Sequence, residues 1–378
     1  MSLVAAVHDT ELAEAIMAWA RIHSPTFDKA GVDRMMDLAA AEAARLGLAV
    51  ERKPGQVYGD TVIARLAGPG GEVEGGILVL GHLDTVHGAD SVGRDLAVSV
   101  EGDRIYGPGI YDMKGGMRMA LHALELIGRL SLKPKLPVTF LFIPDEEIGS
   151  PTSRDLIERE ALRQRYVLVP EPSHDGRVVT GRHAFQRFVL RTRGRPAHAG
   201  VDNRRGKSAI AAMAELIGEI EARSDFDTGE TFSVGVVRGG RFVNVIPTAC
   251  EAEVLCVSPT EASVARVRAA MLGLAGERGQ GVTVEVEPGP VRPLFQCGRG
   301  TLALFERARA IAAEAGLKLG HGQFGGGSDG NFTGALGIPT LDGLGVDGAG
   351  LHTPGEYMIR STLARRCAIL AGLLRDLD

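Results

Sequence analysis

The chain has 378 residues, of which 44% are hydrophobic and 24% are charged, and its formal net charge is -5. These near-average values disfavour a disordered chain, and no apolar run approaches the ~18 residues that a membrane-spanning helix needs. The lysines and arginines are dispersed rather than clustered, which argues against nucleic acid as a partner. The length is too great for one ordinary core and indicates two domains, or one large domain with an insertion.

The four cysteines form no Cys-x-x-Cys pair and no repeated spacing; they are Cys250, Cys256, Cys297 and Cys367. We expect them to be small buried apolar residues in a reducing compartment. The first twenty residues contain acids and no uninterrupted signal-peptide core. The sequence therefore predicts a cytoplasmic protein that does not bind a membrane.

Apolar periodicity places the secondary structure. Helices are predicted over residues 9–20, 27–46, 113–130, 208–222, 259–275, 301–315 and 361–377. Strands are predicted over residues 48–52, 61–66, 76–80, 138–143, 166–169, 185–193, 232–237, 249–257, 282–286 and 337–341. The order of predicted elements changes near Gly181, and from there the strands and helices fit two helices on one face of an antiparallel sheet. We therefore predict an α/β domain (residues 1–181 and 293–378) that carries an inserted α+β domain (residues 182–292).

His82 and Asp84 follow a buried, strand-like run in the first domain. Residues two apart on an extended backbone point to the same side, so Asp84 can accept the spare ring N–H of His82 and fix which nitrogen binds a metal. Taken alone, the pair is also typical of a structural histidine beside a turn aspartate.

Three more segments bring carboxylates to turns and strand ends. Asp112 closes a glycine-rich loop over residues 102–112 and precedes a helix, where an aspartate is often only an N-cap. Glu146, Glu147 and Glu171 follow two apolar strands. Since strand ends on one edge of an α/β sheet are where ligands gather, we expect these groups to converge. A solvated acidic turn is the alternative for residues 145–147.

A second histidine, His352, lies in a later turn and completes a set of nitrogen and oxygen donors without a thiolate. The set is His82, Asp112, Glu147, Glu171 and His352. Such donors suit zinc, or cobalt or manganese, in an open hydrolytic site rather than a closed structural one. Five protein ligands exceed what one tetrahedral zinc uses while keeping water, so two metals that share a carboxylate are predicted.

The order and spacing of these motifs resemble the dizinc amidohydrolases. That family includes glutamate carboxypeptidase of the carboxypeptidase G type, acetylornithine deacetylase, succinyl-diaminopimelate desuccinylase and aminoacylase. The motifs are His82-x-Asp84, Gly-x-x-Asp112-Met113-Lys114-Gly115-Gly116, Glu146-Glu147, Glu171-Pro172-Ser173 and His352. The likeness covers nearly the whole chain and implies a mixed-sheet zinc-peptidase domain with helices on both faces, plus a ferredoxin-like lid and dimerisation domain.

The resemblance also implies roles for the metal ligands. Asp112 would bridge two zinc ions and would be followed by a cis peptide bond to Met113. One metal would take His82 and Glu171, and the other would take Glu147 and His352. The same likeness makes Glu146 the general base for water, with Asp84 as the residue that orients His82.

The inserted domain matches two further family segments. His198, in the segment 194–200, resembles the lid histidine that usually reaches the partner subunit's active site and polarises the scissile carbonyl. Asn244 resembles a lid residue offered to the substrate. Read without the family, His198 is a turn histidine and Asn244 caps a β-turn. The resemblance thus implies a homodimer through the lid domain.

Substrate choice is expected to depend on Arg292 and on the loop containing Gly326, Gly327 and Ser328. In carboxypeptidase G-type members an Arg-Pro here binds the free α-carboxylate, which suits the guanidinium fork, and loop N–H groups can add to the same anion site. A surface ion pair is the alternative for Arg292. In relatives the strand that follows Pro247 often ends in Asp-x-Arg, whereas here it reads Leu255-Cys256-Val257, so one lid arginine is missing.

We therefore expect a metal-dependent hydrolase that cleaves an amide next to a C-terminal amino acid, in a small N-acyl amino acid or short peptide. The alternatives are a biosynthetic deacylase of the acetylornithine deacetylase or desuccinylase type, a dizinc aminopeptidase, and a zinc-binding sensor without activity. The presence of all five ligands and of Glu146 argues against the sensor.

Overall fold

The computed structural model describes residues 2–88, 96–279 and 281–378. The chain forms two compact units, each with its own hydrophobic core. The first unit comprises Met1–Gly181, Phe295–Phe324 and Ser328–Asp378. The second comprises Arg182–Leu294 and Gly325–Gly327.

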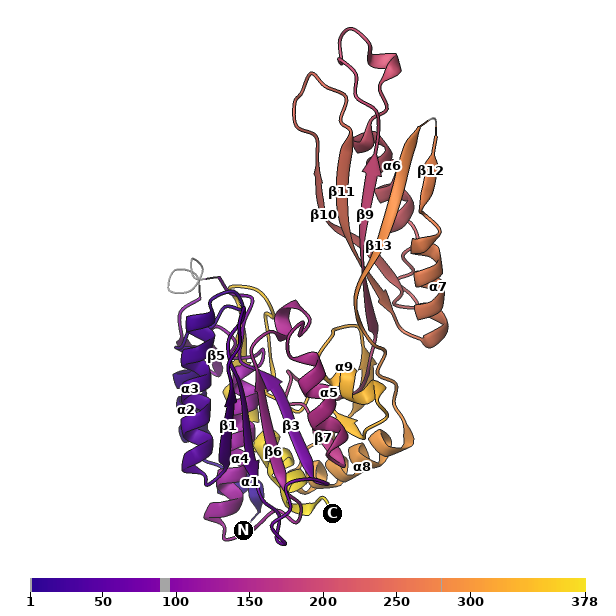
Figure 1. Ribbon diagram of the computed structural model, residues 1–378. Coiled ribbons are helices and arrows are strands. Elements are labelled where there is room, and N and C mark those ends of the chain that lie inside the picture. The colour runs from indigo at the N-terminus through magenta and orange to yellow at the C-terminus, as the bar shows by residue number, and fades with distance from the viewer. Residues whose placement is uncertain (1, 89–95, 280) are drawn as a thin grey trace. The chain divides into compact units, whose positions relative to one another are not determined.

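A six-stranded mixed sheet forms the centre of the first unit, with helices flanking it (Figure 1). Its strands, in spatial order, are β1 (Ala49–Lys53), β2 (Thr61–Leu66), β6 (Val138–Ile143), β3 (Ile77–His82), β7 (Tyr166–Leu168) and β15 (Thr340–Leu341). The pairs β6–β3, β3–β7 and β7–β15 are parallel, whereas β1 and β2 add antiparallel strands at one side. The predicted mixed α/β class is confirmed.

Strands β3 and β6 are buried along their whole length, which explains their continuous apolar sequences. They run side by side in parallel register, so that His82 pairs with Ile143. β7 lies on the other side of β3. Because the three strands are parallel neighbours, the segments that follow them leave the sheet at the same edge.

The first unit contains most of the helices. They are α1 (Leu3–Ala6), α2 (Asp9–Ala20), α3 (Lys29–Arg45), α4 (Lys114–Arg129), α5 (Arg154–Leu162), α8 (Arg299–Glu314), α9 (Gly330–Ala335) and α10 (Leu363–Asp376). Helix α4 is almost entirely buried and contacts α2, α10 and β3. Gly81 lies against Met113 and Met117 at the start of α4, so the helix approaches β3 more closely than a larger side chain would permit.

A smaller antiparallel sheet is formed by the segment before Asp112 and by the segments on either side of His352. Its strands, in spatial order, are β16 (Gly348–Ala349), β17 (Tyr357–Ile359), β5 (Arg104–Tyr106) and β4 (Ser99–Glu101). The prediction of a plain glycine-rich loop over residues 102–112 was therefore wrong for its first part, because β5 pairs with β17 more than 200 residues away. A two-stranded sheet joins β8 (Val178–Arg182) to β14 (His321–Phe324).

The second unit is an antiparallel sheet with helices α6 (Ala209–Glu221) and α7 (Glu261–Leu272). Its strands, in spatial order, are β10 (Thr231–Gly239), β11 (Ala249–Ser258), β9 (Ala184–Arg193), β13 (Val282–Arg292) and β12 (Gly276–Arg278). Without β12, the order and the βαββαβ sequence are those of a ferredoxin-like fold. One sheet face packs on the helices through Phe188, Leu190 and Val254.

The cysteines differ in their burial, and the helices differ in length and polarity from a membrane span. Cys250, Cys256 and Cys367 are buried as expected, but Cys297 is exposed, because it lies in the irregular segment before α8. Across the described residues, the helices are too short or too polar for any of them to span a membrane.

We predict opposite effects for two Gly→Ala changes in α4. A Cβ at Gly116 would lie 1.8 Å from the carbonyl oxygen of Pro170, so Gly116→Ala should lower the free energy of unfolding by about 1–3 kcal/mol or more. Nothing lies within 4 Å of a Cβ at Gly128, so Gly128→Ala should raise stability by up to about 1 kcal/mol. Urea unfolding of both variants measures this, and equal effects would contradict the close approach at Gly116.

Candidate metal centre

The Asp112 carboxylate lies between two histidines from distant parts of the chain. Its Oδ1 is 3.2 Å from Nε2 of His82, and its Oδ2 is 3.2 Å from Nε2 of His352. Asp112 precedes α4, and its peptide bond to Met113 is cis, as the resemblance implied. His352 has a φ of 60° in the turn before β17, a backbone conformation rare for residues other than glycine. Each carboxylate oxygen therefore faces a different imidazole.

Three glutamates approach the two histidines, one beside His352 and two beside His82. Oε2 of Glu147 is 3.1 Å from Nε2 of His352. Oε1 of Glu171 is 3.8 Å from Nε2 of His82, and Oε2 of Glu146 is 3.9 Å from the same nitrogen. Glu146 and Glu147 form a short 3₁₀ turn after β6, and Glu171 follows β7. The structure thus brings all five predicted ligands and Glu146 together.

Asp84 lies behind His82 and is completely buried. Nδ1 of His82 is 3.0 Å from the backbone oxygen of Asp84 and 3.4 Å from its carboxylate. Both neighbours accept hydrogen bonds, so they favour the hydrogen on Nδ1 and leave Nε2 directed at Asp112. The carboxylate also accepts hydrogen bonds from the backbone N–H groups of Glu146 and Glu147. Asp84 therefore helps to position both His82 and the turn that carries Glu146 and Glu147.

The electrostatics of the cluster reflect an excess of carboxylates. Burial and the nearby charge of Asp112 raise the pKa of Glu147 to about 7 and raise the pKa of Glu171 well above its usual range. Hydrogen bonds to Asp112 and Glu147 raise the pKa of His352 to about 10. Burial opposes the charged form of Asp112, but hydrogen bonds to both histidines hold its pKa well below its usual range. Protons bound by Glu147, Glu171 and His352 therefore reduce the net negative charge of the cluster. A bound cation could reduce that charge instead.

The residues fit a divalent metal. The ligand atoms of His82, Asp112 and Glu147 all lie within 4.8 Å of one another. Imidazole nitrogens with carboxylate oxygens are donors for zinc, and for cobalt or manganese. The two histidines lie on opposite oxygens of the Asp112 carboxylate.

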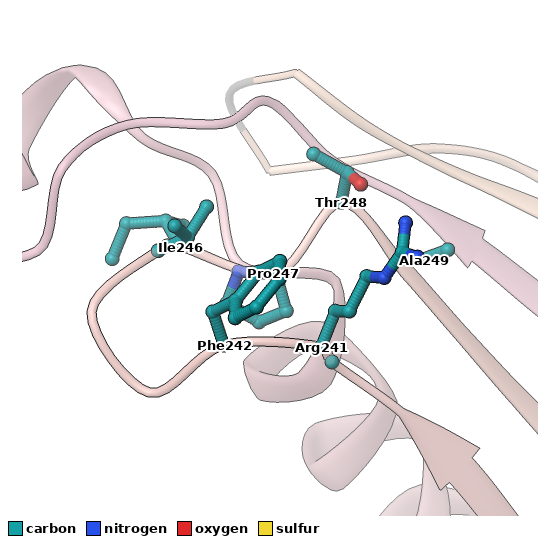
Figure 2. A pocket seen from close by; sticks show the side chains of 8 residues that line it. Arg241, Phe242, Ile246, Pro247, Thr248 and Ala249 are labelled. Atoms are coloured by element: carbon teal, nitrogen blue, oxygen red, sulfur yellow. The ribbon is translucent and has the colours of Figure 1, made fainter.

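The second unit holds His198 and Asn244 on paired loops. His198 is exposed, and its Nδ1 accepts a hydrogen bond from the N–H of Gly200. The N–H of Ala199 donates to the backbone oxygen of Asn244, so the two loops stay adjacent. The loop between β10 and β11 also encloses a pocket of about 280 Å³, which Figure 2 shows with Phe242, Ile246 and Pro247 among its walls. The two loops therefore carry the polar side chains His198 and Asn244, and the loop with Asn244 also carries the apolar pocket walls.

Arg292, at the end of β13, lies beside the glycine segment of the second unit. A Cβ at Gly327 would lie 3.1 Å from Cδ of Arg292, so glycine is needed for this approach. The carbonyl oxygen of Gly326 accepts a hydrogen bond from Nη1 of Arg182. Ser328 belongs to the first unit and is fully buried; its N–H donates to Asn331 and its hydroxyl to Asp342. Both polar groups of Ser328 thus serve the fold here.

Sequence reasoning missed several residues that support the cluster. Thr26 donates its hydroxyl to Asp84 at 2.7 Å, and Lys114 donates to the backbone oxygen of Ile22 at 2.6 Å. Burial lowers the pKa of Lys114 to about 7. Glu356 accepts hydrogen bonds from the N–H groups of Tyr111 and Asp112. Only the short spacing from His352 to Glu356 gave a local signal, because the other contacts join distant segments.

The chain is similar to known proteins of one family. The profile of "Peptidase family M20/M25/M40" matches residues 78–376. The chain is 32% identical to carboxypeptidase G2 of Pseudomonas sp. (strain RS-16), over 94% of this chain and 86% of that protein. It is 28% identical to acetylornithine deacetylase of Myxococcus xanthus, over 57% of this chain and 59% of that protein.

The fold is also found in solved structures. Aminopeptidase PepT from Bacillus cereus ATCC 10987 superposes with a TM-score of 0.76, covering 98% of this chain and 99% of that chain, at 23% identity. The fold and the cluster define a metal-dependent hydrolase of the peptidase and amidohydrolase class. This chain belongs to peptidase family M20/M25/M40, and membership implies a metal cofactor.

We predict that the Thr26 hydroxyl supports the centre through Asp84. Thr26→Val keeps the shape of a buried side chain but removes the donor to a charged acceptor, which should cost about 1.5–3 kcal/mol of stability. Thr26→Ser retains the hydroxyl and is the matched control. Urea unfolding and zinc affinity should both rank Val below Ser; the reverse order would show that the hydroxyl is unimportant.

Proposed function

We propose that this protein is a dizinc hydrolase that cleaves the amide bond next to a C-terminal amino acid, with cobalt or manganese as alternative metals. The observation that carries the proposal is Asp112, whose two carboxylate oxygens each face a different histidine at 3.2 Å. One metal would be held by His82, Asp112 and Glu171, and the other by Asp112, Glu147 and His352. The first unit would be the catalytic domain.

When bound, the two ions would lower the pKa of a water molecule and polarise the substrate carbonyl. Glu146 would accept a proton as the water oxygen bonds to the carbonyl carbon, and would return it to the nitrogen as the C–N bond breaks. Its backbone N–H donates to Asp84 at 3.2 Å, so the same carboxylate that orients His82 also holds the base. His198 would polarise the carbonyl from a partner subunit.

The second unit would act as the lid and dimerisation domain of a homodimer. β10 lies at one edge of its sheet, and the adjoining loop exposes Phe242 and Val243. The exposed sheet face is instead crossed by ion pairs, including Arg191 with Glu251 at 2.7 Å and Arg193 with Glu285 at 3.0 Å. Paired charges are costly to bury, so the edge of the sheet is the better surface for a partner.

Substrate binding would depend on Arg292, with Asn244, Gly326 and Gly327 as further contacts. The similarity to carboxypeptidase G2, which extends over 94% of this chain, supports release of a C-terminal amino acid. The similarity to acetylornithine deacetylase supports a deacylase as a second candidate. Both reactions yield an amino acid with a free carboxylate, which an arginine can bind through two parallel hydrogen bonds. The two reactions would differ in the acyl group that is removed from the amino acid.

Glu146 and Glu147 should separate turnover from metal binding. Glu146→Gln should lower kcat by about 10²–10⁴-fold with N-acyl amino acids while zinc remains bound. Glu147→Gln is the matched control and should lose metal, because Glu147 contacts His352 in the cluster. Metal analysis together with steady-state kinetics measures both. Loss of zinc from the Glu146 variant alone would show that the two roles are exchanged.

Arg292 should act on the substrate carboxylate. Arg292→Ala should raise KM about 10–100-fold for N-acyl amino acids, the cost of a charge-assisted hydrogen bond, and should change little for the corresponding amino acid amides. Arg193→Ala is the control, because Arg193 is exposed in the same unit and pairs with Glu285. An equal effect on acids and amides would contradict carboxylate recognition by Arg292.

A further inference from the structure

Glu356 is a buried carboxylate with four polar contacts, although it is not among the predicted ligands. Oε1 accepts the N–H groups of Tyr111 at 2.8 Å and Asp112 at 3.0 Å. Oε2 accepts the N–H of Gly109 at 3.0 Å and lies 2.6 Å from Nε2 of His87. Three backbone N–H groups thus donate to one carboxylate, and the His87 ring provides its fourth polar contact.

These contacts join the three segments that carry His82, Asp112 and His352. His87 is five residues after His82, Gly109 and Tyr111 lead into Asp112, and Glu356 itself is four residues after His352. Pairing of β17 with β5 brings the last two segments together next to Glu356. One side chain therefore links three loops whose own sequences do not fix their relative positions.

We propose that Glu356 is a positioning residue that sets the spacing between His82, Asp112 and His352, and so determines metal affinity. The inference rests on the proposed metal site. Replacing a buried acceptor leaves several N–H donors unsatisfied, and the loop before Asp112 would then relax. The Asp112 carboxylate would no longer face both imidazoles in one geometry. Groups that orient metal ligands in this way typically contribute about 10–100-fold in metal affinity.

The chain offers a graded series with a control. Glu356→Ala removes all four polar contacts. Glu356→Gln keeps one oxygen, but its amide would face N–H donors in either orientation. Glu160→Gln is the control, because Glu160 is an equally buried carboxylate of the first unit that pairs with Arg65 at 2.8 Å. All variants would be compared as full-length chains for zinc affinity by chelator competition, for the visible spectrum with Co²⁺, and for thermal unfolding without metal.

We expect zinc affinity to fall about 10–100-fold in Glu356→Ala and less in Glu356→Gln, with altered Co²⁺ spectra in both. Glu160→Gln should lower the unfolding temperature while it keeps the wild-type affinity and spectrum. Wild-type affinity and spectrum in Glu356→Gln would overturn the proposal, even if the alanine variant does not fold. Absence of metal binding by the wild-type protein would instead overturn the proposed function, and this outcome is visible before any variant is made.

Discussion

The metal centre depends on one buried carboxylate that is not itself a predicted ligand. Asp84 contacts Nδ1 of His82 and accepts backbone hydrogen bonds from Glu146 and Glu147, while Thr26 donates to it from the segment before α3. A buried charge is costly unless it is fully hydrogen-bonded, and here these bonds connect β3, β6 and the N-terminal region. The hydrogen bonds that stabilise the buried Asp84 carboxylate therefore also fix the positions of one histidine and two glutamates.

The parallel sheet supplies the other half of the arrangement. His82 ends β3, and Glu147 and Glu171 follow the neighbouring parallel strands β6 and β7, so their convergence is a consequence of topology rather than of local sequence. Placing these acids together is unfavourable by itself, because burial and then the nearby charge of Asp112 raise the pKa of Glu147 and Glu171. The fold holds these groups together through buried strands, and a divalent cation is the species that such a cluster accommodates best.

Much of this could be predicted from the sequence. The apolar runs identified β3 and β6, and parallel strands require their ends to meet, so His82 and Glu147 were expected near each other. The pairing of β5 with β17 and the role of Glu356 were not predicted, because contacts between residues 250 positions apart leave no periodic pattern. Ser328 was predicted to bind substrate from the glycine-rich composition around it, yet its burial and its contact with Asp342 depend on tertiary packing.

Both units contain residues that the sequence predicts to be functional. The first carries the ligands and Glu146, and the second carries Arg292, His198 and Asn244, which are proposed to bind the substrate. We propose that Asp112 bridges two metals. Anomalous diffraction at the zinc absorption edge from crystals grown with zinc tests it most directly. We predict two peaks that flank Asp112, one beside His82 and Glu171 and the other beside Glu147 and His352. A single peak, or a peak without Asp112 as ligand, would contradict this account.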